Sequence, residues 1–77
     1  MNIPPQPQVV FWIQDGQDRY PCLGQLIYER GEPYAIPNNP IPGYPRIKLE
    51  AAQLEKQSDA TLGLPWFVHR GLVVVSS

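Results

Sequence analysis

The segment Ile36–Pro45 constrains the fold of this 77-residue chain more than any other segment, because four of its ten residues are proline. Each proline removes a backbone donor and pushes the preceding residue towards extended geometry. Neither a helix nor a central strand passes through such a segment. The sequence therefore predicts a surface loop over 37–45, between a hairpin-like N-terminal part and a C-terminal part with one short helical pattern.

Size and composition indicate one small folded domain. The apolar share of 43% is near the usual globular range of about 45–50%. A disulfide within the chain is excluded, since Cys22 is the only cysteine, and with His69 it supplies two soft ligands where a structural zinc needs four. We therefore expect no metal and no cofactor. Stability should come from an apolar core or from self-association, with a homodimer through a strand edge as the candidate form.

The N-terminus is predicted to be an extended arm over 1–8, because Pro4, Pro5 and Pro7 favour polyproline II. The domain proper is expected over 9–77. Five β-branched or aromatic residues in a row, Val9–Ile13, predict a strand over 8–14 that ends at an Asp-Gly turn.

A second strand composition predicts a hairpin of 22–29 with 33–37. Arg30-Gly31 offers the positive φ of its tight turn. Gly24 is expected to mark a bulge or a close approach, and Pro33 to confine the return strand to an edge.

Beyond the loop, good helix formers dominate, and Ile47, Ala51 and Leu54 would share one helical face. This pattern predicts a helix at about 49–58. The alternation over 46–50 fits a short strand equally well.

The segment 66–75 has the strongest β preference in the chain. Arg70-Gly71 could turn it into a hairpin, or Gly71 could mark a bulge in one long strand, and a hairpin or strongly bent strand is the preferred interpretation. The whole pattern predicts a mainly β fold of four or five short strands with one short helix. The architecture would be a small antiparallel sheet or an SH3-like, partly open barrel.

Charge gives little support to nucleic-acid binding. Seven acidic and six basic residues leave a net charge of −1, and the basic residues form no run. The alternative hypothesis is a barrel-type nucleic-acid module that uses Arg46, Lys48 and Arg70 with a stacking aromatic. The N-terminus lacks the pattern of a signal peptide and no apolar run could cross a bilayer, so we expect no membrane association. The lone thiol favours the cytoplasm.

Catalytic patterns are weak. Cys22 lies between Pro21 and Leu23 and is expected to be a small buried hydrophobe, and His69 is the sole imidazole. The carboxylates gather at predicted turns, where Asp and Glu are common solvated residues, and no glycine-rich phosphate loop is present. We expect no enzyme. An uncharacterised enzyme centred on His69 or Cys22 is the third hypothesis.

The aromatic residues give the leading functional hypothesis. If Val9, Phe11 and Ile13 face the core, Trp12 lies on the opposite face of its strand, and the same alternation separates Trp66 from Phe67. Exposed aromatics mark binding surfaces, although the proline loop could also cover them. The sequence predicts a non-enzymatic protein–protein interaction module: an accessory subunit, adaptor or inhibitor of a larger partner. Its candidate contact residues are Trp12, Tyr44, Trp66, Pro40 and Pro42.

Overall fold

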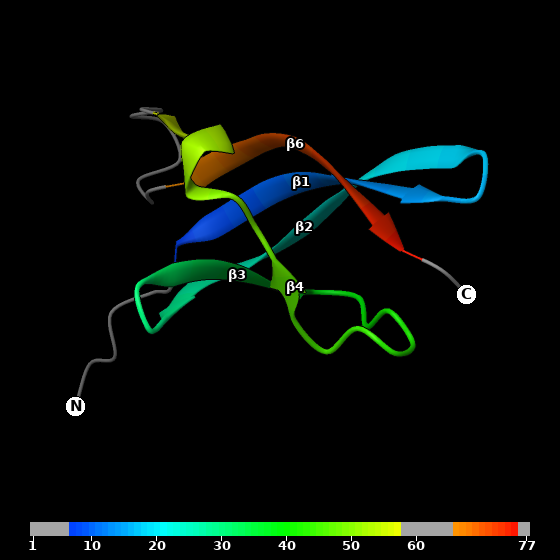
Figure 1. The fold of residues 1–77 in the computed structure, drawn as a ribbon, viewed down its shortest axis with the longest axis horizontal. Coiled ribbons are helices and arrows are strands. Elements are labelled where there is room, and N and C mark those ends of the chain that lie inside the picture. Colours follow the sequence, from blue (N-terminus) through cyan, green and yellow to red (C-terminus); the bar gives the residue numbers. More distant parts are fainter. Residues whose placement is uncertain (1–6, 58–65, 76–77) are drawn as a thin grey trace.

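The computed structural model describes residues 7–57 and 66–75. The strands in these ranges are β1 (Gln8–Asp15), β2 (Asp18–Glu29), β3 (Glu32–Pro37), β4 (Ile47–Lys48), β5 (Leu54–Gln57) and β6 (Trp66–Val75), and one 3-10 turn, η1 (Ala51–Gln53), precedes β5. They form one mixed sheet in the order β4-β3-β2-β1-β6-β5 (Figure 1). The predicted β-rich class is confirmed, with six strands in the described part rather than four or five. No helix within these ranges has the length and apolar character to cross a bilayer.

The first three strands form an antiparallel meander through two tight turns. The first turn is closed by the pair Asp15 and Asp18, with Gly16 at φ +63°. The second has both central residues in the left-handed region, Arg30 at φ +53° and Gly31 at φ +80°, as a type I′ hairpin turn requires. The strand predicted over 8–14 is confirmed. Residues 1–6 of the predicted arm lie outside the described residues, and its last residue, Gln8, begins β1.

The predicted hairpin is confirmed, although β2 begins at Asp18 and not at Cys22. Gly24 is a point of close approach with no bulge, because its pairing with Val9 and with Pro37 is continuous. A Cβ atom at Gly24 would lie 2.5 Å from the Ile36 carbonyl oxygen. Glycine is therefore required for β2 and β3 to pair at this position.

β6 is one continuous strand that runs parallel to β1, so the hairpin interpretation of 66–75 is wrong. Val68 aligns with Val10 and Leu72 with Trp12, so four steps along β6 match two along β1. The additional residues form a bulge around His69–Gly71. The alternative of one strand with a bulge is therefore correct, and the bulge lets β6 keep its direction along β1.

The helix predicted at 49–58 is wrong. Residues 51–53 form η1, residues 54–57 form β5, and position 58 lies outside the described residues. β5 pairs antiparallel with the first half of β6, from Leu54 opposite His69 to Gln57 opposite Trp66. The face that a helix would bury, Ile47, Ala51 and Leu54, is narrow and offers little apolar surface, and no side chain caps η1 at Glu50. Pairing with β6 supplies the backbone hydrogen bonds that an isolated short helix would make poorly.

The short strand suggested by 46–50 is present as β4, which pairs with Tyr34 and Ala35 of β3. β3 is therefore not the edge of the sheet, contrary to the expectation from Pro33. The additional edge strand is short, since β4 has only two residues. Pro33 is still accommodated, since its carbonyl accepts a hydrogen bond of 3.0 Å from Leu49 N and no donor is needed from it.

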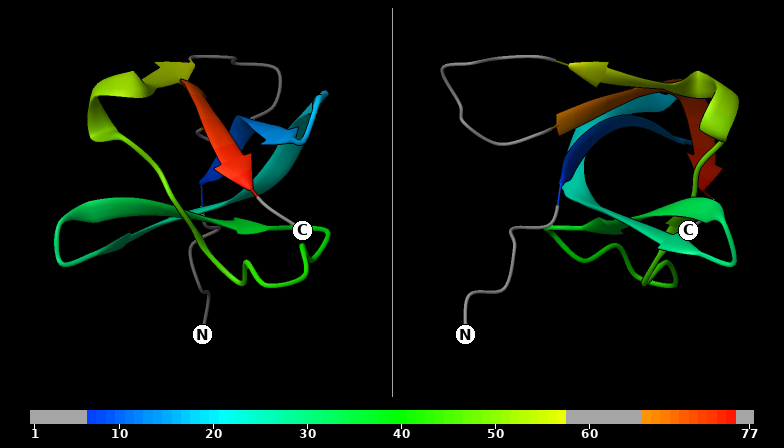
Figure 2. Two further views of the ribbon diagram at one scale, coloured as in Figure 1. Left: turned by 45° about the vertical axis from the view of Figure 1, so that its right-hand side comes forward. Right: turned by 90° about the vertical axis from the view of Figure 1, so that its left-hand side faces the viewer.

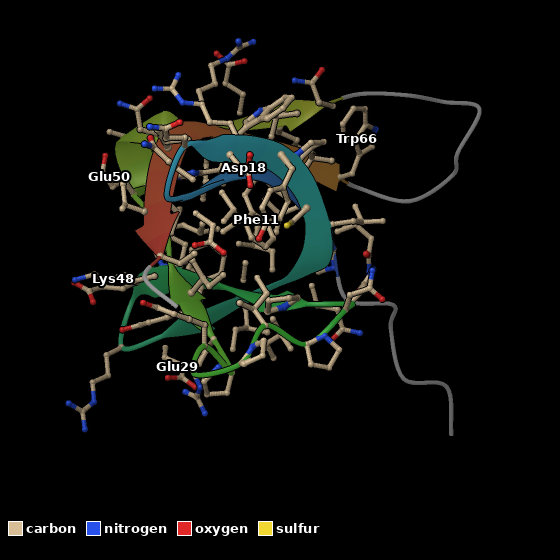
Figure 3. The ribbon with its side chains drawn as sticks, turned by 90° about the vertical axis from the view of Figure 1, so that its right-hand side faces the viewer. Phe11, Asp18, Glu29, Lys48, Glu50 and Trp66 are labelled. Atoms are coloured by element: carbon tan, nitrogen blue, oxygen red, sulfur yellow. The ribbon has the colours of Figure 1, made fainter. Side chains whose placement is uncertain are left out.

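The sheet coils around its own core, as the two views of Figure 2 show. The loop through η1 connects the strands at the two ends of the sheet order, β4 and β5. Alternate residues of the strands point inwards, and Phe11 lies inside the coil in Figure 3. The buried apolar core consists of Val9, Phe11, Ile13, Leu26, Ala35, Ile47, Leu49 and Val75. The opposite residues of the same strands therefore face outwards.

Candidate functional site

Exposed apolar side chains gather on the outer face of β2, β1 and β6. Trp12 pairs with Pro21 on one side and with Leu72 on the other, so these three side chains form a row across the sheet. Leu23 and Val74 extend the row at neighbouring outward positions. Exposed fractions are 43% for Trp12, 42% for Leu72, 48% for Leu23 and 69% for Val74. We call these five residues, Trp12, Pro21, Leu23, Leu72 and Val74, the outer apolar face.

The outer apolar face follows directly from strand alternation. Val9, Phe11 and Ile13 are fully buried on the inner side, which places Trp12 on the outer side. Pairing then carries the same face to β2 and β6. The sequence indicated Trp12, but it gave no signal for Leu72, Val74 or Leu23, because their position depends on the register between strands.

Trp66 also has outward parity, since it aligns with Gln8 of β1, while Phe67 packs against the core. Trp66 is nevertheless half-buried, at the periphery of the molecule in Figure 3. Its indole Nε1 is buried and has no acceptor among the described residues. Trp66 therefore presents less surface than Trp12.

The remaining candidate contacts lie in the proline loop, away from Trp12. Ile41 and Tyr44 close a tight turn through a 2.9 Å backbone hydrogen bond, with Gly43 at φ +84°. Tyr44 is half-buried and packs against the core. Pro40 and Pro42 are exposed. The structure thus divides the five sequence-predicted contact residues between the outer face of the sheet and the loop.

Pro40 and Pro42 line an open groove of about 560 Å³ between the loop and β2. Its β2 wall consists of residues 20–23, its loop wall of residues 37 and 39–42, and Asp15 lies at one end. Most of the lining is apolar, and Asp15 is the only charged residue in it. Sequence reasoning missed this groove, because it forms only where β2 extends past the end of β3.

The three cations of the nucleic-acid hypothesis are each engaged with a carboxylate. Arg46 pairs with Glu29, Lys48 Nζ lies 3.3 Å from Glu32, and Arg70 lies 2.7 Å from Glu55. The side-chain hydrogen bond from Arg70 lowers the pKa of the Glu55 carboxyl group. The first two pairs are neighbours at the β2–β3 turn, because Glu29 pairs with Glu32 across the hairpin, whereas Arg70 and Glu55 join β6 to β5. Each cation faces its own carboxylate, so the three residues do not form a joint positive patch.

The His69 imidazole is buried in the β6 bulge, with 2% of its surface exposed. Its Nε2 accepts a hydrogen bond of 3.0 Å from the Glu50 backbone N–H, which leaves Nδ1 to donate to the Gly71 carbonyl at 3.0 Å. Burial lowers the pKa of His69 below its usual value, although Gly71 and Glu50 act in the opposite direction. Both ring nitrogens therefore hold the fold together, between the bulge and the start of η1.

Gly71 makes room for this ring. A Cβ atom at Gly71 would lie 2.8 Å from His69 Cε1. His-Arg-Gly within a strand pattern is the sequence signal for this arrangement, because the glycine lies two residues after the imidazole it makes room for.

Cys22 is half-buried on the inner side of β2, where it packs against the core and borders the groove. Burial raises the pKa of its thiol, so the less reactive protonated form is favoured. In the described part of the chain no three acidic, histidine or cysteine side chains come together as metal ligands.

Comparison with known proteins gives no family model, no curated protein and no solved structure that matches this chain.

Proposed function

We propose that this protein is a non-enzymatic protein–protein interaction module that binds its partner through the outer apolar face. The observation that carries the proposal is the row of Pro21, Trp12 and Leu72 across three adjacent strands, continued by Leu23 and Val74. Single exposed apolar residues are normal on protein surfaces. A contiguous group around a tryptophan is the composition of an interface centre.

The partner is expected to supply an apolar surface, because no charged residue belongs to the outer apolar face. A second copy of this chain meets that requirement, and a homodimer remains our proposed alternative to a larger protein partner. The finer fold assignment, a partly open barrel of the SH3-like kind, and the cytoplasmic location also remain proposals. The coiling of the sheet supports the first, and the lone cysteine supports the second.

The test compares the wild type with Trp12→Thr and Leu72→Thr, which truncate the side chain but keep a β-forming residue. Tyr28→Thr is the control, because Tyr28 is also exposed but has the parity of the buried Leu26 and so lies on the other side of β2 from this face. Each tagged protein is incubated with an extract of the cells it comes from, and the captured proteins are quantified by mass spectrometry. Sedimentation velocity over a range of concentrations measures self-association of the same four proteins.

A partner retained by the wild type and Tyr28→Thr, and lost from both face variants, would support the proposal. Truncation of an interface anchor costs about 2 kcal/mol or more, which is roughly a thirtyfold loss of affinity. Circular dichroism must show that both variants stay folded. Equal retention of every partner by all four proteins, in both assays, would refute the proposal.

We do not propose nucleic-acid binding or catalysis as a second function. Ion pairing of Arg46, Lys48 and Arg70 and the structural hydrogen bonds of His69 give neither hypothesis a specific supporting observation.

A further inference from the structure

The edge of β2 that faces away from β1 lacks a strand partner over part of its length. β3 pairs only with Gly24–Glu29, so Asp18–Leu23 has β1 on one side and no strand on the other, and residues 20–23 of this stretch border the groove. The chain leaves the line of β3 at Asn38, whose N–H donates to Leu23 O at 2.9 Å. The groove therefore occupies the place where β3 would continue.

Backbone carbonyl groups of β2 point away from β1, towards the position that a continued β3 would occupy. Leu23 O faces away from β1, because Asn38 bonds it from the groove side. Antiparallel pairing alternates every two residues, so the carbonyls of Pro21 and Arg19 face the same way. Among the described residues, no backbone hydrogen bond from the proline loop reaches either carbonyl. Two acceptors thus lie on this edge of β2 at the spacing of a strand: the Pro21 carbonyl beside the groove, and the Arg19 carbonyl just beyond Tyr20, where the β2 wall of the groove ends.

The groove walls suit an extended chain with apolar side chains. Tyr20 and Cys22 form the β2 wall on the inner side, and Pro40, Ile41 and Pro42 form the opposite wall. Prolines have a fixed φ, so the loop wall loses little freedom when a ligand binds. Asp15 places one negative charge at the end of the groove.

We propose that the groove binds an extended peptide segment of a partner protein, which adds a strand beside Asp18–Leu23. The occupant donates backbone N–H groups to the Arg19 and Pro21 carbonyls and lays alternate apolar side chains into the groove. It carries a lysine or arginine at the end that meets Asp15. Because Pro21 has no N–H, the edge offers one donor fewer than an ordinary strand, which restricts the peptides that fit. The groove borders Pro21 and Leu23 of the outer apolar face. The backbone edge and the inner-side residues Tyr20 and Cys22 that carry this proposal are not part of that face, so the proposal does not depend on the function proposed for it.

The probe is a displayed library of random twelve-residue peptides, selected on the intact wild-type protein. Enriched peptides are synthesised with a fluorophore, and affinity is measured by anisotropy. Tyr20→Thr removes an aromatic from the groove wall, and Tyr28→Thr is the matched control, since Tyr28 is an exposed tyrosine of the same strand outside the groove. Asp15→Asn tests the charge, with Glu50→Gln as its control outside the groove.

We expect enriched peptides to alternate apolar residues and to contain a basic residue. Tyr20→Thr should weaken them at least about fivefold, by analogy with truncation of an interface aromatic, and Tyr28→Thr should not. Asp15→Asn should weaken basic peptides about two- to fivefold, as expected for an exposed ion pair, and should leave a neutral peptide unchanged. Glu50→Gln should bind both peptides as the wild type does.

Cys22 provides an independent measurement of where the peptide binds, because it is the only cysteine and borders the groove. Alkylation by iodoacetamide at alkaline pH should slow in proportion to peptide occupancy. The proposal would be overturned if the selection enriched no peptide, or if a bound peptide left the rate of Cys22 alkylation unchanged. It would also be overturned if Tyr20→Thr and Tyr28→Thr lost affinity equally. Trp12→Thr should retain peptide binding, so failure of the outer apolar face and failure of the groove can be told apart.

Discussion

Replacement of His69 by leucine is the sharpest test of how this fold is held together. In the wild type, Nε2 of the buried imidazole accepts the Glu50 N–H and Nδ1 donates to the Gly71 carbonyl. A leucine side chain fills much of the space of the buried imidazole, but it can make neither hydrogen bond. The β6 bulge then loses its link to the segment that enters η1.

The magnitude follows from the Glu50 N–H, which loses its acceptor. An unsatisfied buried donor costs about 1–3 kcal/mol, and because Glu50 is an exposed residue that water can approach, we expect about 1–2 kcal/mol at pH 8. A 77-residue domain has a free energy of unfolding of about 4–12 kcal/mol, at ~0.05–0.15 kcal/mol per residue. The variant should therefore fold, with a clearly lower stability.

The difference between wild type and variant should also depend on pH. Burial lowers the pKa of His69 in the folded protein below the ordinary value of 6.5. As the pH falls through 6.5, the unfolded chain takes up a proton before the folded chain does, so the wild type loses stability. The stabilisation by neutral His69 is complete above this pH and is lost as the pH falls from about 6.5 through the lower folded pKa. His69→Leu has no such proton, so the difference between the two proteins should shrink on acidification.

The assay is urea unfolding followed by tryptophan fluorescence at pH 8, 7, 6 and 5, with stability obtained by linear extrapolation. Other titrating groups act alike in both proteins, so the difference isolates His69. A difference that stays constant from pH 8 to 5, or that grows on acidification, would refute the assignment of a neutral, doubly bonded imidazole.

Three further predictions concern the sheet, the core and the surface. Gly24→Ala should destabilise the protein by about 1–3 kcal/mol in urea unfolding, because the new methyl group meets the backbone of Ile36 and cannot move aside; wild-type stability would mean that β2 and β3 pair differently. Phe11→Ala should cost about 3–5 kcal/mol and leave much of the population unfolded in a thermal melt, since Phe11 is fully buried at the centre of the coil; a cooperative melt at the wild-type midpoint would contradict this. Arg70→Gln should leave the thermal midpoint almost unchanged and reduce its small dependence on salt, because the pair with Glu55 is solvent-exposed; a large fall in the midpoint would show a role beyond this pair.

The local features of this protein follow from its amino-acid sequence alone. The β-branched run at Val9–Ile13 determined β1 and placed Trp12 on the outer side, because alternation along a strand depends only on the covalent chain. The tight turns at Gly16 and Gly31 follow from the few residue types that accept positive φ. The prolines of 37–45 determined the loop, since they lack the donors of a helix or central strand.

The features that depend on a partner strand arise only when the sheet has assembled. Residues 54–57 became β5 and not a helix because β6 offers an edge, and local propensity is too weak to oppose that pairing. The bulge buried His69, and the extension of β2 past β3 created the groove. The outer apolar face combines residues more than fifty positions apart, whose alignment is a property of register between strands and appears in no local stretch of sequence.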